Sequence, residues 1–498
     1  MIVQRVAQCF FPALANVTLC QIWWFGANQT HTVIEFGKRC NAMDVRPWTG
    51  SVGDAMTDVV LDCRMPERMT ETALPASIAA SGDPGGQSAP LTGLVLSGGG
   101  ARAAYQVGVL KAIAQLVAGA HRSTSCPFQV LVGTSAGAIN ATALASGADN
   151  FGALVARIAN VWENFRAEQV YRADAFGVVR SGARWLSTLS LGWALFSLFG
   201  NRSGMRPRSL LDNAPLEALL ERMIDAHRIE DMLAARHLHA LAVTVSSYTS
   251  GQHVTFYQCR EAIAPWTRSQ RLAVRAPITT AHLLASSAIP FMFPARELVL
   301  AGRREFFGDG SMRQLAPISP AIHLGAEKVL VVGAGRLHEP PLDVSEAPPA
   351  SYPTLAQIAG HALSSIFLDG LAVDIERLGR INHTLSLLPP EGRERSALRT
   401  IDVLVIAPSE RLDDIAARHI ASLPRPVRAL LGAIGVEGSG RASANGVERR
   451  GASGAALASY LLFEADYTRE LIALGVADTM VRKDEVLRFL GASGRSAQ

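Results

Sequence analysis

Short apolar runs alternate with longer amphipathic stretches through the middle of this 498-residue chain. Residues 94–96 form the first run typical of a buried strand, and residues 105–117 place apolar side chains at the spacing of one helix face. Residues 128–132 form the next strand-like run. Two strands joined by one helix make a βαβ unit, in which the strands are parallel. The pattern therefore predicts an α/β domain that begins at about residue 91.

Later stretches continue this alternation. Strand-like runs recur at residues 240–246, 252–257, 297–300, 304–307, 328–332 and 403–406. Helical or partly irregular stretches are predicted for residues 151–235, 352–385 and 455–490.

Composition divides the chain into five parts. Residues 1–90 lack sustained periodicity and end in an Ala/Ser/Gly/Pro-rich tract, so we predict a disordered or loosely packed leader. Residues 91–335 hold the α/β domain, and residues 336–435 are predicted to form a helical extension with a late strand, packed on the core. Residues 436–454 are predicted to be a flexible Gly/Ser/Ala/Arg linker, and residues 455–498 to be closing helices.

The stretch from Gly133 to Gly137, GTSAG, has the order strand, sharp turn, helix. Ser135 stands at the apex of the turn, where the small residues around it leave room for a tight backbone bend. The helix predicted at residues 138–145 directs its amino end at the serine, and that end favours developing negative charge. We predict that Ser135 is a nucleophile, with an incidental Gly- and Ser-rich turn as the alternative.

A serine nucleophile needs a base and a site for the oxyanion. The triplet Gly98, Gly99 and Gly100 follows the first strand, and its backbone N–H groups, free of side-chain bulk, can surround a tetrahedral intermediate. Arg102, just beyond, is predicted either to steady this loop or to hold an anionic head group. The alternative is that the glycines only permit a tight strand-to-helix turn.

The spacing Gly98-x-Gly100-x-x-Ala103 also resembles a dinucleotide-binding fingerprint. That fingerprint requires an acidic residue about 20 positions downstream to hold a ribose. No Asp or Glu occurs from Ala101 through Ala148, which argues against a bound dinucleotide.

Asp309 is the candidate base. It stands between Gly308 and Gly310 at the end of a predicted strand, where a carboxylate can be presented in a cleft. An ordinary Asp-Gly turn has the same local sequence, and the neighbouring residues alone do not decide between the two.

Together these motifs resemble the patatin-like phospholipase family. The resemblance rests on GGGAR at residues 98–102, GTSAG at 133–137 and DG at 309–310, and it covers about residues 91–335. It implies a three-layer α/β/α sandwich with a mainly parallel central sheet. It also implies Ser135 as nucleophile, Asp309 as the base that acts on it without a histidine, and the Gly98–Gly100 loop as oxyanion hole.

The activity that the resemblance implies is that of a serine acyl hydrolase, which cleaves acyl esters of phospholipids or other lipids through an acyl-enzyme. No metal and no organic cofactor is implied. Two positions depart from the family pattern: Ala103 replaces the usual glycine after the arginine, and Ser311 replaces the last small residue of D-G-[GA]. The Ser311 side chain would either crowd Asp309 or donate a hydrogen bond to it, and each changes the pKa of the carboxylate.

Two other functions are compatible with the same residues. Ser135, Asp309 and His323 occur in the Ser…Asp…His order of α/β-hydrolase esterases, although His323 lies where a helix is predicted to start and a lone histidine there is more often structural. The second is a catalytically inert patatin-type fold that binds lipid. The intact serine and aspartate argue against that function.

The bulk composition excludes further classes. A net charge of +4 is small for this length and does not indicate nucleic-acid binding. The six cysteines include no C-x-x-C pair, so we expect free thiols in a reducing compartment. Residues 6–25 are apolar but broken by polar side chains and lack a clean cleavage site, so no signal peptide is predicted. No stretch forms a convincing membrane span.

Residues 185–201 are uncharged and are flanked on both sides by arginines. The flanking residues are Arg180, Arg184, Arg202, Arg206 and Arg208. An apolar stretch with basic flanks suits a bilayer interface that contains anionic lipid, whereas a buried helix with solvated ends is the alternative. We therefore expect a cytoplasmic protein or one peripheral at the membrane, with residues 185–208 as the candidate contact surface.

Overall fold

The computed structural model describes residues 32–34, 45–47, 90–120, 124–173, 209–336, 352–436 and 454–491. Most of the predicted leader and linker, and all of the predicted membrane-contact segment 185–208, lie outside these described residues. The chain divides into two compact units, Met1–Gly82 and Asp83–Gln498. In the first unit, strands β1 (Thr32–Ile34) and β2 (Val45–Pro47) pair antiparallel.

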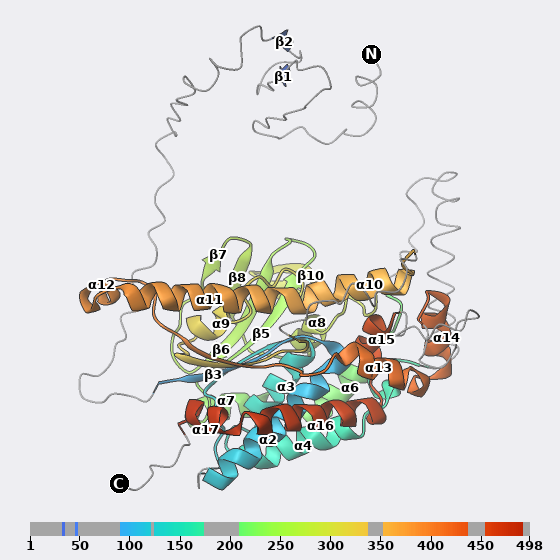
Figure 1. Ribbon diagram of the computed structural model, residues 1–498, viewed down its shortest axis with the longest axis horizontal. Helices are drawn as coiled ribbons and strands as arrows, with labels where there is room; N and C mark the ends of the chain where they lie inside the picture. The colour runs from blue at the N-terminus through green and yellow to red at the C-terminus, as the bar shows by residue number, and fades with distance from the viewer. Residues whose placement is uncertain are drawn as a thin grey trace, which may run out of the picture. The chain divides into compact units, whose positions relative to one another are not determined.

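The second unit is built on a mixed, mainly parallel sheet with ten strands in its described part (Figure 1). The strand order is β12–β11–β3–β4–β5–β6–β8–β7, and β10 pairs with both β5 and β9. Neighbours from β12 to β5 are parallel, whereas β5 and β6 are antiparallel. The strands are β3 (Thr92–Leu96), β4 (Val130–Thr134), β5 (Ala240–Ser247), β6 (His253–Cys259), β7 (Thr267–Arg268), β8 (Arg271–Arg275), β9 (Arg296–Leu300), β10 (Arg303–Asp309), β11 (Lys328–Val332) and β12 (Asp402–Ile406).

The strands predicted from the sequence all form, with small shifts at their ends. The parallel pairing of β3 with β4 confirms the predicted βαβ unit. Strands β7 and β8 were not predicted. Their sequences, TR and RLAVR, are short and rich in arginine, and β7 is exposed, so they lack the apolar run that signals a buried strand.

Alternate residues along each central strand enter two different hydrophobic clusters. On β3, Leu94 and Leu96 belong to one cluster, whereas Val95 belongs to the other. Side chains point to opposite faces of a sheet with a period of two, so the two clusters mark its two faces. Both faces are therefore covered, which explains why these strands are apolar throughout.

Helices cover both faces of the sheet (Figure 1). The larger cluster contains side chains of α2 (Ala104–Ala120), α3 (Ala136–Ala145), α4 (Phe151–Glu163), α6 (Ala214–Met223), α7 (His227–Ala234), α8 (Thr280–Ser286), α10 (Leu355–Ser364), α13 (Leu412–His419), α14 (Arg425–Ala433), α15 (Ala455–Leu461), α16 (Ala465–Val481) and α17 (Lys483–Phe489). The smaller cluster contains side chains of α9 (Ser319–His323) and α11 (Gly370–Leu387). The predicted three-layer α/β/α sandwich is confirmed.

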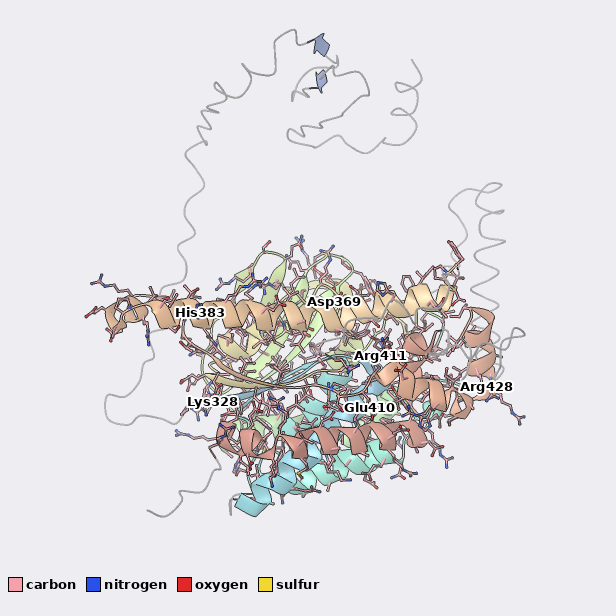
Figure 2. All side chains as sticks on the ribbon, in the orientation of Figure 1. Lys328, Asp369, His383, Glu410, Arg411 and Arg428 are labelled. Atoms are coloured by element: carbon pink, nitrogen blue, oxygen red, sulfur yellow. The ribbon has the colours of Figure 1, made fainter. Side chains whose placement is uncertain are left out.

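One helix, Leu355–Leu387, runs continuously through α10 and α11 and is joined between them by a π-helical turn, Ser365–Asp369. Asp369 and His383 mark two points along it (Figure 2). Among the described residues it is the one helix long and apolar enough to cross a bilayer, by length and composition only. Here one side of it packs on the sheet, and its buried Asp374 carboxylate accepts a hydrogen bond of 3.0 Å from the backbone N–H of Ile318.

The C-terminal helices α16 and α17 pack directly against the sandwich. Helix α16 crosses α2 at Gly108 and Gly475, where an added Cβ on either glycine would overlap the backbone of the facing helix. The Tyr105 hydroxyl of α2 donates to the Asp478 carboxylate of α16 at 2.9 Å. Lys328, at the amino end of β11, donates through Nζ to the carbonyl of Phe489 in α17 at 2.9 Å (Figure 2). The backbones of α2 and α16 therefore approach each other closely because both positions lack a side chain.

We expect the substitution Gly475→Ala to lower the free energy of unfolding by about 1–3 kcal/mol, because the new methyl group has no space and forces the two helices apart. Urea unfolding followed by circular dichroism measures the change. The control is Gly379→Ala on α11, where an added Cβ meets no atom within 4 Å. That variant should be as stable as the wild type or more stable by about 0.5–1 kcal/mol. Equal effects of the two substitutions would contradict the close packing of α2 and α16.

Candidate active site

Strand β5 brings Ser135 and Asp309 together. One edge of β5 pairs with β6 along residues 240–246. The other edge is shared: β4 pairs with residues 240–244 and ends at Thr134, and β10 pairs antiparallel with residues 245–247 and ends at Asp309. Two strands that approach from opposite directions therefore end at neighbouring positions of the same edge. This meeting point places residues that are 174 positions apart side by side.

Ser135 is held in a strained backbone conformation at the turn between β4 and α3. Its φ of 56° and ψ of −129° lie in a region that residues other than glycine seldom adopt. The side chain is 1% exposed, and its Oγ donates a hydrogen bond of 2.6 Å to Oδ2 of Asp309. Strained residues of this kind cluster at functional sites, where the surrounding structure holds them in place.

The two glycines of GTSAG are required by close backbone contacts. A Cβ at Gly133 would overlap the backbone of Gly137 and Ala138, and a Cβ at Gly137 would overlap the carbonyl groups of Leu96 and Ser97. The turn is therefore compact because both flanking positions lack a side chain. This is the local reason for the spacing noted in the sequence.

Asp309 is fully buried, at 0% exposure. Its Oδ1 accepts a hydrogen bond of 2.9 Å from the backbone N–H of Ser311, while Oδ2 accepts the one from Ser135. Burial raises the pKa of the Asp309 carboxyl to about 6, although the hydrogen bonds from Ser135 and Ser311 favour the charged form and partly offset that rise. A carboxylate with this pKa is ionised at neutral pH and able to accept a proton.

Further residues fix the geometry of the pair, and the sequence alone did not identify them. The Ser286 hydroxyl accepts from the backbone N–H of Ser135 at 2.8 Å and donates to the carbonyl of Thr244 at 2.7 Å. Behind the aspartate loop, the Nε2 atom of His253 lies 3.1 Å from the carbonyl oxygen of Gly310. Burial lowers the pKa of His253 to about 4, so the ring is neutral at pH 7 and donates through Nε2. Ser286 and His253 belong to no recognisable sequence motif, because each contacts a residue that is distant along the chain.

The glycine triplet follows β3 and leads into a 3₁₀ turn, Gly100–Ala103. Gly100 has a φ of +54°, and an added Cβ there would overlap the carbonyl of Tyr460. In the part of the chain that the structure describes, the backbone N–H groups of Gly98 and Gly99 donate no hydrogen bond to another backbone group. Gly100 lines the same pocket as Ser135. The geometry is compatible with the predicted oxyanion hole.

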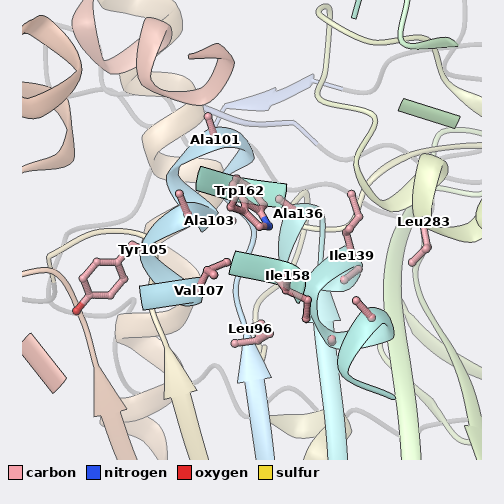
Figure 3. Close-up of a cluster of buried hydrophobic side chains, with 14 of the residues drawn as sticks. Leu96, Ala101, Ala103, Tyr105, Val107, Ala136, Ile139, Ile158, Trp162 and Leu283 are labelled. Atoms are coloured by element: carbon pink, nitrogen blue, oxygen red, sulfur yellow. The ribbon is translucent and has the colours of Figure 1, made fainter. Parts of the chain in front are cut away.

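An apolar pocket adjoins Ser135. Its lining is mainly aliphatic and aromatic and includes Ile139, Trp162, Phe165, Leu216, Leu219, Leu220, Met223, Ile289, Phe293 and Phe463. Trp162 lies beside Ala136 and Ile139 in the core around Leu96 (Figure 3). The cavity measures about 30 Å³, far below the roughly 300–1,000 Å³ of typical ligand pockets. Any longer ligand must displace some of these side chains.

Arg102 is buried, at 2% exposure, and its guanidinium contacts the C-terminal helices. It forms an ion pair with Asp413 of α13, donates through Nε to the Ser459 hydroxyl of α15 at 2.7 Å, and lies 4.1 Å from the centre of the Tyr460 ring. These contacts fit the prediction that Arg102 steadies the glycine loop. An anionic head group would have to displace Asp413 to reach it.

His323 is separate from the serine and aspartate. It is the last residue of α9, not the start of a helix as predicted. Its Nδ1 lies 2.9 Å from the carbonyl oxygen of Ser319, and its ring stacks on Trp266 at 4.8 Å. Within the described residues no hydrogen bond joins His323 to Ser135 or Asp309.

We expect the substitution Asp413→Asn to lower the free energy of unfolding by about 3 kcal/mol, because it leaves the buried charge of Arg102 without its carboxylate. The value lies at the lower end for a broken buried pair since Asp413 is partly exposed. Denaturant unfolding measures the loss.

Asp149→Asn is the matched control, because Asp149 pairs with Arg228 where both side chains are about 40% exposed. Exposed pairs contribute about 0–1 kcal/mol, so this variant should be nearly as stable as the wild type. A similar loss of unfolding free energy in both variants would show that burial of Arg102 does not make its ion pair more stabilising than an exposed one.

Comparisons with known proteins give one family match. Residues 94–322 match the model of the patatin-like phospholipase family. Comparison with curated protein sequences gives no match. Ser135 and Asp309 both lie within the matched region.

Three solved structures are similar to parts of this chain. VipD from Legionella pneumophila is 13% identical, over 78% of this chain and 67% of that chain, with a TM-score of 0.27. Human GIVD cytosolic phospholipase A2, bound to methyl gamma-linolenyl fluorophosphonate, is 13% identical over 81% and 59%, with a TM-score of 0.32. ExoU from Pseudomonas aeruginosa, in complex with SpcU, is 20% identical over 33% and 34%, with a TM-score of 0.17.

At these TM-scores the structural likenesses carry no conclusion about this chain. The family match, by contrast, covers the whole stretch from the glycine triplet to the aspartate and agrees with the observed sandwich. Residues 94–322 are therefore a domain of the patatin-like phospholipase family.

Proposed function

We propose that this protein is a serine acyl hydrolase that cleaves acyl esters of phospholipids or other lipids through an acyl-enzyme on Ser135. The observation that carries the proposal is the 2.6 Å hydrogen bond from Ser135 Oγ to Oδ2 of Asp309, on a strained turn inside a patatin-like phospholipase domain. A nucleophile and its base need to lie within this distance for direct proton transfer.

In the first step Asp309 accepts the proton of Ser135 as Oγ attacks the carbonyl carbon of the ester. The carbonyl electron pair moves onto oxygen, and this oxyanion is stabilised by the backbone N–H groups of the Gly98–Gly100 loop and by the amino end of α3. The tetrahedral intermediate then expels the alcohol oxygen, which takes the proton from Asp309. The products of this step are the free alcohol and an ester between Ser135 and the acyl group.

The second step reverses these roles with water as nucleophile. Asp309 takes a proton from water, the hydroxide attacks the acyl-enzyme, and Ser135 Oγ leaves and recovers that proton from Asp309. The fatty acid departs and the enzyme is restored. One carboxylate serves as base and then as acid in both steps, so the reaction needs no histidine.

The apolar pocket beside Ser135 suits the hydrocarbon part of a lipid substrate. Its lining offers aliphatic and aromatic surface and few polar groups, which favours an acyl chain over a polar ligand. Because the cavity is only about 30 Å³, side chains such as Phe463 must move when a chain enters. The contact of residues 185–208 with anionic lipid, and a location in the cytoplasm or at the membrane surface, remain predictions.

We expect Ser135→Ala to abolish labelling by a fluorophosphonate probe and to lower kcat for ester hydrolysis by about 10⁴-fold or more, because one hydroxyl carries the covalent step. In-gel fluorescence and hydrolysis of a soluble short-chain ester provide the two measurements. Ser146→Ala is the control: this buried serine lies at the far end of α3, where its hydroxyl donates to the carbonyl of Ala143. Full activity in a folded Ser135→Ala protein would rule out the proposed mechanism.

The pH dependence should reveal the raised pKa of Asp309. Below about pH 6 the carboxyl is protonated and unable to accept the proton of Ser135, so kcat/KM should fall about tenfold per pH unit. Above that pH it should be constant until another group titrates. A pH profile measured on a soluble ester avoids effects of a lipid surface, and Asp309→Asn should lack the acid limb in any remaining activity. A midpoint near pH 4 would mean that burial does not perturb the base.

A further inference from the structure

The hydroxyl of Ser311 is buried beside Asp309 and has no well-aligned acceptor among the described residues. Ser311 is 4% exposed, and among the described residues its Oγ makes no hydrogen bond of regular geometry, although it lies near enough to the Asp309 carboxylate to help lower its pKa. Its backbone N–H, in contrast, donates to Oδ1 of Asp309 at 2.9 Å. Leaving a buried hydroxyl unpaired costs about 1–3 kcal/mol, a cost that the alanine or glycine of the D-G-[GA] pattern would avoid. Such a group in a folded protein calls for an explanation.

The surroundings of this hydroxyl indicate where it acts. A Cβ built on Gly98 would overlap Ser311 Oγ, so the hydroxyl lies directly against the first glycine of the triplet. Ser311 is two positions from Asp309 in the chain, and its backbone N–H donates a hydrogen bond to the Asp309 carboxylate. Ser311 Oγ is therefore close to both the carboxylate of Asp309 and the glycine loop. In the mechanism proposed above, both contribute groups to the space beside Ser135 in which an ester carbonyl must sit.

We propose that Ser311 is a further catalytic residue, whose hydroxyl donates a hydrogen bond to the carbonyl oxygen of the ester as that oxygen becomes the oxyanion. The proposal rests on the function proposed above and adds a side-chain donor to the backbone donors of the glycine loop. No proton is transferred in this contact: the Ser311 proton stays on its oxygen, and the proton of Ser135 still travels by way of Asp309. The substrate thus provides the well-aligned acceptor that Ser311 Oγ does not find among the described residues.

The main alternative is that Ser311 acts only through Asp309. The hydroxyl is near enough to the carboxylate to help lower its pKa, although it makes no hydrogen bond of regular geometry. In that case removal of the hydroxyl would raise the pKa of Asp309, and activity would recover fully at higher pH. An oxyanion donor behaves differently, because its loss slows the reaction at every pH.

The test is Ser311→Ala, assayed on the plateau above the acid limb. We expect kcat to fall about 10²-fold with little change in KM, as for loss of one oxyanion donor, and thermal unfolding to be unchanged or to occur at a higher temperature. The loss should be similar for a p-nitrophenyl ester and for an alkyl ester of the same acid, since both form the oxyanion. Ser146→Ala, the buried serine remote from the site, should keep the wild-type kcat.

Three results would overturn the proposal. A wild-type kcat on the plateau, with the acid limb shifted to higher pH, would mean that Ser311 acts only by lowering the pKa of Asp309. A loss confined to the alkyl ester would make the hydroxyl a donor to the leaving oxygen. An unchanged rate of fluorophosphonate labelling would also count against it, since the phosphonyl oxygen occupies the oxyanion position. Full activity of Ser135→Ala would instead remove the proposed function itself, so the two failures are distinguishable.

Discussion

One edge of β5 accommodates two strands, and the site depends on how they share it. Strand β4 occupies the edge as far as Thr244, and β10 occupies it from Val245 onward. Both strands must therefore end between Thr244 and Val245 of β5. Ser135 directly follows β4, and Asp309 is the last residue of β10. A one-residue slip of β10 would put Gly308 or Gly310 opposite Val245 and turn the carboxylate to the other face of the sheet. Register along β5 thus controls whether Ser135 meets the carboxylate that we propose as its base.

The same region is held in place by contacts that leave no room for side chains. Gly137 packs on the carbonyl groups at the end of β3, Gly310 packs on the backbone of Thr244, and Gly100 packs on the backbone of α15. Arg102 then links the glycine loop to α13 by an ion pair and to α15 by a hydrogen bond. The helices after the matched region are consequently part of the wall around Ser135, as Phe463 also illustrates.

Local patterns were sufficient for much of the fold. They also singled out Ser135 and Asp309, which the structure joins by a hydrogen bond, and whose catalytic roles stay predictions. The strands β3, β4 and β11 are continuous apolar runs because both faces of the sheet are covered, and the GTSAG turn has small residues because its backbone contacts demand them. The partners of Arg102 and of Ser135 were not predictable, because Asp413 and Ser286 act across 311 and 151 positions without any motif of their own. His323 was misplaced by one helix length, since a five-residue helix leaves almost no periodicity.

The hydrogen bond from Arg102 to Ser459 joins residues that are 357 positions apart in the chain. A protein is synthesised from its amino end, so the segment with Ser135 and Asp309 leaves the ribosome well before the helices that hold the glycine loop. During that interval the arginine has no buried partner and the loop has no neighbouring backbone to rest on. We therefore expect catalytic competence to arrive last, after α13 and α15 have docked. On the proposed function, the order of translation would thereby delay hydrolysis until α13 and α15 are in place.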